Sequence, residues 1–207
     1  MPDLHFLICA VIVLALIFDF INGFHDTANA IATSVSTRAI SPNDAILMAA
    51  VLNFLGAMYS TGVAKTIGAD IVQSASQVNE HVLIAALAGA VIWNMLTWWA
   101  ALPSSSSHAL VGGVIGAVLV STGADGLNVF GIGKIVLSLV TSPLLAILSG
   151  CVIMRALYWL FGRCTPHNIN DKFKKMQIMS AATMAFSHGS NDAQKSMGII
   201  TLALLSG

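Results

Sequence analysis

The sequence predicts an all-α integral membrane protein, and three observations support this fold class. Only 9% of the 207 residues are charged, whereas a soluble domain carries about 25%. Hydrophobic residues make up 57%, which excludes a disordered chain and leaves too few charged side chains to cover a soluble surface. Several apolar stretches also reach the roughly 20 residues that a helix needs to cross a bilayer.

The charged residues exclude further classes of protein. The 9 Lys and Arg residues are scattered and balance 9 Asp and Glu residues, so no basic patch for nucleic acid is expected. The three cysteines show neither metal-binding nor redox spacing. We therefore expect no nucleic-acid partner and no cofactor.

Four stretches are expected to form spanning helices, because each is long, apolar and almost free of charge. They cover residues 4–21, 45–64, 82–102 and 135–161. Trp98 and Trp99 near the end of the third, and Trp159 near the end of the fourth, are typical of the membrane interface. These stretches predict a multi-pass protein of the cell (plasma) membrane.

Residues 22–40 and 103–123 are expected to differ from these helices, since polar side chains interrupt both. The second stretch leaves an apolar core over 109–120 that is too short to span, so we expect a re-entrant, serine-rich hairpin at about 103–123. Irregular backbone at membrane depth is tolerated only where protein buries it or where it lines a wet cavity. Both stretches therefore predict broken helices and candidate functional segments.

Residues 162–176 hold the densest positive charge of the chain, and their single acidic residue is Asp171. The positive-inside rule places this segment, which we expect to be a loop, in the cytoplasm. It separates residues 1–161 from residues 177–207.

A short repeat occurs on both sides of this segment. Residues 23–29 read Gly-Phe-His-Asp-Thr-Ala-Asn, and residues 189–195 read Gly-Ser-Asn-Asp-Ala-Gln-Lys. Duplicated, glycine-interrupted segments in two halves of a membrane chain point to a transporter site between inverted repeats. We interpret 1–161 as a first transmembrane repeat and 177–207 as the start of a second.

Each copy of the repeat carries an aspartate at membrane depth, where a carboxylate costs about 2.5–3.5 kcal/mol and needs a cavity or a partner. Asn29 follows Asp26 at i+3, so their oxygens can converge on a cation such as sodium. Structural roles are the alternative. Backbone donors can satisfy Asp26, and Lys195 can pair with Asp192 at i+3.

The serines at 104–107 follow Pro103 and precede the apolar core of the hairpin, where the N-cap and first turn of a helix belong. Their hydroxyls, the free backbone N–H groups and the positive end of the helix dipole predict an anion site. The alternative is a polar turn at the membrane surface. Contact with a substrate and a capping or packing role are both open for His108.

With these motifs the chain resembles the inorganic phosphate transporter family, the bacterial low-affinity phosphate permeases and their eukaryotic sodium–phosphate relatives. The matching stretches are residues 18–30, 103–108 and 188–195, in the same order and spacing. The resemblance implies inverted repeats with re-entrant hairpins and no enzymatic activity. Family members are longer and carry a second Ser/Thr-rich hairpin, so residues 177–207 are expected to be a truncated second repeat.

The resemblance implies a secondary active transporter, a cation-coupled symporter of inorganic phosphate, moved as free phosphate or as a metal–phosphate complex. The coupling ion, Na⁺ or H⁺, stays open, and the expected partners are phosphate, this cation and the lipid bilayer, with a homo-oligomer as an option. The implied phosphate-binding residues are Ser104, Ser105, Ser106, Ser107, Asn191 and Lys195. The implied cation-coupling residues are Asp26, Asn29, Asp192 and Gln194, with sodium at Asp26, Asn29 and Asp192.

Three other functions compete with this interpretation. A permease for sulfate or arsenate would use the same anion site. A divalent metal carrier would use His25, Asp26, His188 and Asp192, but would leave the serines unexplained. An intramembrane hydrolase would need a serine nucleophile beside His108, although neighbours in sequence rarely have that geometry and no Gly-x-Ser-x-Gly motif is present.

Overall fold

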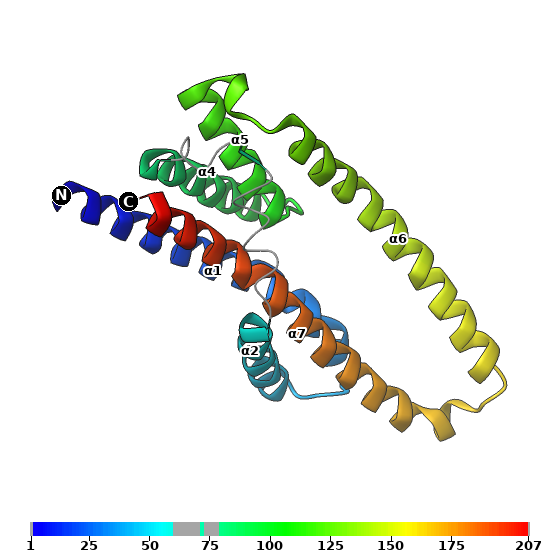
Figure 1. Cartoon of the computed structure of the whole chain (residues 1–207). Coiled ribbons are helices and arrows are strands. Elements are labelled where there is room, and N and C mark those ends of the chain that lie inside the picture. Colours follow the sequence, from blue (N-terminus) through cyan, green and yellow to red (C-terminus); the bar gives the residue numbers. More distant parts are fainter. Residues whose placement is uncertain (1, 60–70, 73–78, 207) are drawn as a thin grey trace.

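The computed structural model describes residues 2–59, 71–72 and 79–206, and the regular elements in these ranges are helices (Figure 1). In chain order they are α1 (Pro2–Ser36), α2 (Pro42–Tyr59), α4 (Glu80–Trp99), α5 (Ser106–Thr122), the 3-10 helix η2 (Ala124–Gly126), α6 (Val129–Phe161) and α7 (Pro166–Ser206). The predicted all-α membrane fold class is confirmed. Within the described ranges, three helices are long and apolar enough to cross a membrane: His5–Ser36, Glu80–Trp99 and Val129–Phe161.

α1 runs without a break through the first polar stretch and ends at Ser36. The prediction of irregular backbone over residues 22–40 is therefore wrong for residues 22–36, which are helical. A helix satisfies its own backbone N–H and C=O groups in an apolar medium, so it can carry polar side chains without unwinding. The chain turns after Ser36, where Arg38 adopts a left-handed backbone conformation with φ 56°.

α4 and α5 form an antiparallel hairpin. Near the turn that connects the two helices, the Thr97 hydroxyl donates to the Ser104 hydroxyl at 2.9 Å. Farther along, the backbones approach closely, because a Cβ added to Gly113 would lie 2.4 Å from the backbone oxygen of Ala86. Residues 103–123, where we expected the whole hairpin, contribute only its second arm, because α5 is one continuous helix and the first arm is α4, which we expected to span the membrane. That the hairpin re-enters the membrane stays a prediction.

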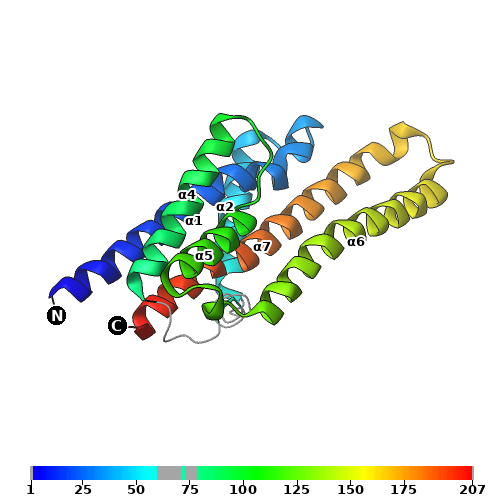
Figure 2. The ribbon, with the colours of Figure 1, turned by 90° about the horizontal axis from the view of Figure 1, so that it is seen from above.

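α7 lies antiparallel to α1 and also packs against α2 (Figures 1 and 2). Two glycines allow the close approach of α2 and α7. A Cβ on Gly189 would lie 2.0 Å from the backbone oxygen of Asn53, and one on Gly56 would lie 2.1 Å from the backbone oxygen of Phe186. The motif glycine of the second repeat copy is therefore a contact point between two helix backbones.

The buried apolar side chains form two separate clusters. The larger one joins α4 and α5 to the first half of α1 and the end of α7, with Phe18, Leu87, Leu110 and Ile199 among its buried members. The smaller one joins the second half of α1 to α2 and the middle of α7 through Ile31 and four alanines. Residues 19–26 of α1 and 188–196 of α7 carry the polar side chains that lie between them.

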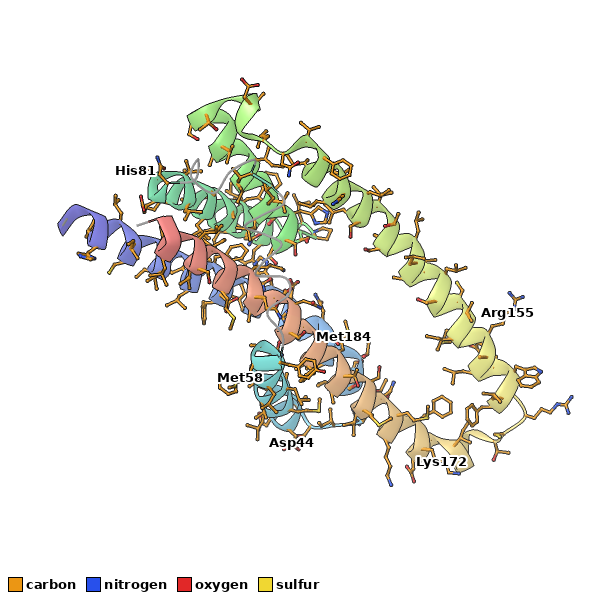
Figure 3. The ribbon with its side chains drawn as sticks, viewed as in Figure 1. Asp44, Met58, His81, Arg155, Lys172 and Met184 are labelled. Atoms are coloured by element: carbon orange, nitrogen blue, oxygen red, sulfur yellow. The ribbon has the colours of Figure 1, made fainter. Side chains whose placement is uncertain are left out.

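α6 stands apart from the other helices along most of its length (Figure 1). Its one buried residue is Gly131, Pro143 lies inside it, and most of its large apolar side chains are exposed, as expected for a helix that faces lipid. α7 begins at Pro166, so residues 166–176, which we expected in a loop, are helical. Arg155 of α6 and Lys172 of α7 lie at the same end of the molecule (Figure 3).

Candidate functional site

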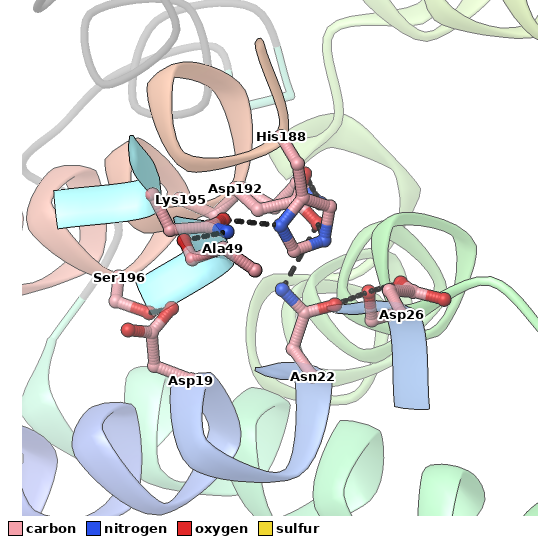
Figure 4. Close-up of polar contacts among 10 residues, drawn as sticks. Asp19, Asn22, Asp26, Ala49, His188, Asp192, Lys195 and Ser196 are labelled. Atoms are coloured by element: carbon pink, nitrogen blue, oxygen red, sulfur yellow. Dashed lines mark hydrogen bonds and ion pairs between the residues drawn. The ribbon is translucent and has the colours of Figure 1, made fainter. Parts of the chain in front are cut away.

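Polar side chains of α1 and α7 meet where these antiparallel helices cross the middle of the bundle (Figure 4). The Asn22 amide donates from Nδ2 to Oδ2 of Asp192 at 3.0 Å. About one turn away, the Ser196 hydroxyl donates to Oδ1 of Asp19 at 3.2 Å. Ligand atoms of Asp26 and Asp192, the aspartates of the two repeat copies, also lie within 4.8 Å of each other, so segments far apart in the sequence meet here.

Asp192 is the most highly connected residue of this cluster. Besides Asn22, it contacts Nζ of Lys195 at 2.7 Å and Nε2 of His188 at 3.2 Å. His188, Asp192 and Lys195 share one face of α7, because i+3 and i+4 neighbours project from the same side of a helix. Lys195 is buried, with 6% of its surface exposed, so its charge depends on Asp192 for compensation. The pairing of Lys195 with Asp192, which was the structural alternative, is found.

His188 links this cluster to α2. Its Nδ1 lies 2.7 Å from Oδ1 of Asn53, while Nδ2 of Asn53 donates to the Ala49 carbonyl at 2.8 Å. In this orientation of the amide, Oδ1 of Asn53 is the acceptor, so Nδ1 of His188 carries the proton. Nε2 on the other side of the ring faces Oδ2 of Asp192 at 3.2 Å, a contact that is an ion pair only when both ring nitrogens carry a proton.

The start of α5 reaches the cluster from the opposite side. Ser106 is buried, its hydroxyl donates to Oδ1 of Asn22, and it lies 3.5 Å from Oδ2 of Asp26. Ser105 is the N-cap residue of α5 and makes no side-chain capping bond. Of the four predicted serines, Ser106 is the one placed in direct contact with the cluster, and Ser104 is bonded to Thr97.

Other predicted site residues are placed less directly. Asn29 and Asn191 have exposed side chains, and His108 is exposed as well. Gln194 is fully buried and donates from Nε2 to the backbone oxygen of Ser190. The hydrolase interpretation gains no support, since an exposed His108 does not form the buried nucleophile–base pair that such chemistry needs.

Sequence reasoning did not single out four residues that join the cluster: Asp19, Asn22, Asn53 and Ser196. Asn22 precedes Asp26 by one helical turn, and this spacing was the signal available for it. Asn53 interrupts an otherwise apolar stretch of α2, and Asp19 likewise interrupts the apolar start of α1. Isolated polar residues in spanning helices are site candidates, because they need a partner.

The cluster offers ligands for a cation. One ligand atom each from Asp26, His188 and Asp192 lie within 4.8 Å of one another. Two carboxylates and an imidazole suit a divalent transition metal, although Lys195 competes for Asp192. A cleft of about 410 Å³ adjoins the cluster, and its lining includes Asp19, Asn22 and Asn53. The cleft offers ample room for a small hydrated ion.

The fold and this cluster define a membrane protein in which polar side chains of both repeat copies converge between its helices. The chain belongs to the phosphate transporter family, whose profile matches residues 22–170 and 162–206. The family is one of transporters and not of enzymes, as the sequence predicted.

Individual relatives agree with this assignment. The chain is 50% identical over 196 residues to the "Probable low-affinity inorganic phosphate transporter" of Bacillus subtilis, covering 94% of this chain and 59% of the relative. It is 45% identical to a protein of the same name from Streptomyces halstedii, covering 88% of this chain and 86% of that one. The "Low-affinity inorganic phosphate transporter PitB" of Escherichia coli is 36% identical, with 92% and 44% covered. The chain thus spans about half the length of most of the curated relatives that it matches.

A solved structure described as "The sodium-dependent phosphate transporter" has the same fold. Its TM-score to this chain is 0.81 at 24% sequence identity, and the match covers 96% of this chain and 67% of that one.

Proposed function

We propose that this chain carries the phosphate and cation site of a secondary transporter that moves inorganic phosphate across the cell membrane together with a cation. One observation carries the proposal: side chains of α1, α5 and α7 converge, with Asn22 bonded to both Ser106 and Asp192. The names of the relatives supply the substrate, inorganic phosphate.

Phosphate is assigned to the start of α5. Its serine hydroxyls and first-turn N–H groups are neutral donors, which bind an anion without holding it permanently. A carrier must also release its cargo, and a dense set of arginines would oppose release. We retain Ser104–Ser107 and Lys195 as phosphate-binding residues. Asn191 stays a proposed member on sequence grounds alone.

The charges of the site support the proposal that a cation accompanies phosphate. Phosphate carries between about one and two negative charges near neutral pH, and Asp26 and Asp192 add two carboxylates. Lys195 already compensates Asp192 at 2.7 Å. Phosphate near Asp26 would therefore be repelled unless a cation binds with it. We assign this cation to Asp26 and Asp192, with Asn29 and Gln194 proposed from the sequence.

A metal–phosphate complex is the second candidate cargo. The grouping of Asp26, His188 and Asp192 within 4.8 Å favours a divalent cation that enters with the anion. Uptake that requires a divalent cation, with labelled metal and labelled phosphate entering together, would support this form. Uptake unaffected by a chelator would exclude it.

Uptake of labelled phosphate tests the proposal, in cells that lack other phosphate uptake and express the protein. We expect uptake that excess phosphate and arsenate inhibit and that sulfate inhibits less. Replacing sodium by choline at fixed pH identifies the coupling ion, because uptake falls only if sodium is coupled. Uptake no greater than in empty-vector cells, or inhibited by sulfate and not by phosphate, would contradict the proposal.

A further inference from the structure

Asn94 of α4 is a buried polar residue outside the contacts described above. It is 0% exposed, and neither its Oδ1 nor its Nδ2 has a hydrogen-bond partner within the described part of the chain. Asn22, which is also buried, has both groups bonded. Folded proteins rarely bury both groups of an amide unpaired, because the lost hydration is not replaced.

The register of the α4–α5 hairpin places Asn94 beside the start of α5. Thr97 contacts Ser104, and Gly113 faces Ala86 farther along the antiparallel pair. Between these two points, Asn94 falls at the level of the Ser105–Ser106 turn. It is the same Ser106 whose hydroxyl bonds Asn22.

The packing of α4 on α1 also places Asn94 at the height of the cluster. The two helices run in the same direction (Figure 2), and the Phe24 and Trp98 rings contact each other with centroids 5.7 Å apart. Asn94 lies one turn before Trp98, and therefore at the level of Phe20 and Asn22 on α1. Ala90, Asn94 and Thr97 are all buried and share one face of α4, because i, i+4 and i+7 positions align on a helix.

We propose that Asn94 is a further binding residue for the transported ions, on the α4 side of the site. Its amide has one donor and one acceptor group, which suits an anion that travels with a cation. Nδ2–H would donate to a phosphate oxygen, and Oδ1 would face the cation. This inference rests on the proposed function, since it takes phosphate and a cation as the cargo.

The structure offers a test that separates binding from folding. In N94L, leucine has a similar branched shape and no polar atoms. If Asn94 only packs, removing two unpaired groups should leave folding intact or improve it, and binding of phosphate should not change. If Asn94 binds the ions, N94L should lose affinity without losing stability.

The measurement is the thermal unfolding of the purified chain in detergent, titrated with inorganic phosphate in sodium chloride. We expect N94L to unfold at or above the wild-type temperature without phosphate, and to bind phosphate about 10- to 150-fold more weakly, as for a lost hydrogen bond to a charged group. L87A, which truncates a fully buried apolar residue of the same helix, is the matched control. It should lower the unfolding temperature and leave the phosphate affinity unchanged.

The outcomes distinguish this inference from the proposed function. Wild-type protein that phosphate does not stabilise would overturn both. Wild-type binding together with equal binding by N94L would overturn only the role of Asn94. N94S, a smaller polar variant, answers the question if N94L does not fold: its shorter hydroxyl should also weaken binding, and unchanged affinity would overturn the inference.

Discussion

The aspartates at matching positions of the two repeat copies have different surroundings. Asp192 on α7 contacts Asn22, His188 and Lys195 at 2.7–3.2 Å. The contact described for Asp26 on α1 is a long one, 3.5 Å to the Ser106 hydroxyl. The first glycines of the two copies, Gly23 and Gly189, also differ in how closely other atoms pack against them.

A Cβ on Gly23 would meet no atom within 4 Å, whereas one on Gly189 would lie 2.0 Å from the Asn53 backbone. The same short motif therefore serves two purposes. The copy on α7 holds three helices together by charge pairing and close packing. The copy on α1 leaves its carboxylate with few partners, which makes Asp26 the better candidate for a cation ligand.

Asp192→Asn should have the largest effect on stability. It removes the charge that compensates the buried Lys195, and breaking a buried ion pair on one side costs about 3–5 kcal/mol. Chemical unfolding of the detergent-solubilised protein measures this loss. Asp26→Asn is the matched control, which we expect to leave unfolding nearly unchanged while it abolishes or uncouples phosphate uptake. Equal destabilisation by both variants would contradict the difference between the two aspartates.

Gly189→Ala should have the next largest effect. The added methyl group would collide with backbone atoms of Asn53, which cannot move without separating α2 from α7. Overpacking of this kind costs roughly 1–3 kcal/mol, and contact with backbone favours the upper end. Gly23→Ala should be neutral or slightly stabilising, because its surroundings are open and alanine favours helix. The unfolding temperatures of the two variants check this pair, and a drop of the same size in both would show that the model of close packing at Gly189 is wrong.

Ser106→Ala should have the smallest effect. In the proposed site it removes one neutral donor to phosphate, worth about 0.5–1.5 kcal/mol, so the apparent affinity for phosphate should fall roughly 2- to 13-fold. A double change at Ser105 and Ser106 should weaken affinity further. The apparent KM of phosphate uptake measures both. An unchanged KM in the double variant would show that Ser105 and Ser106 do not bind phosphate.

The sequence was a better guide to which segments of α1 and α7 lie together than to the local structure of α1 and the orientation of α5. A charged side chain inside a membrane is costly wherever it lies, so Asp26 and Asp192 could be proposed as candidate site residues from the sequence alone. Which serine faces the cluster depends on the rotation of α5, which four consecutive serines do not reveal. The continuous α1 was missed because polar residues inside an apolar stretch are compatible with both a broken helix and a regular one. Asn53 was missed because its role comes from the packing of α2 against α7, and its own neighbours in sequence are apolar.

The division of the apolar core into two clusters has a mechanical consequence. Interdigitated apolar side chains resist sliding within each cluster, whereas the contacts of Asp19, Asn22 and Ser106 at the boundary are polar and can exchange with ions. α1 and α7 run through both clusters, so these two helices carry the polar boundary between them. An ion that bound at this boundary would contact both helices between the two clusters, so its binding energy would bear on how the clusters are held relative to each other.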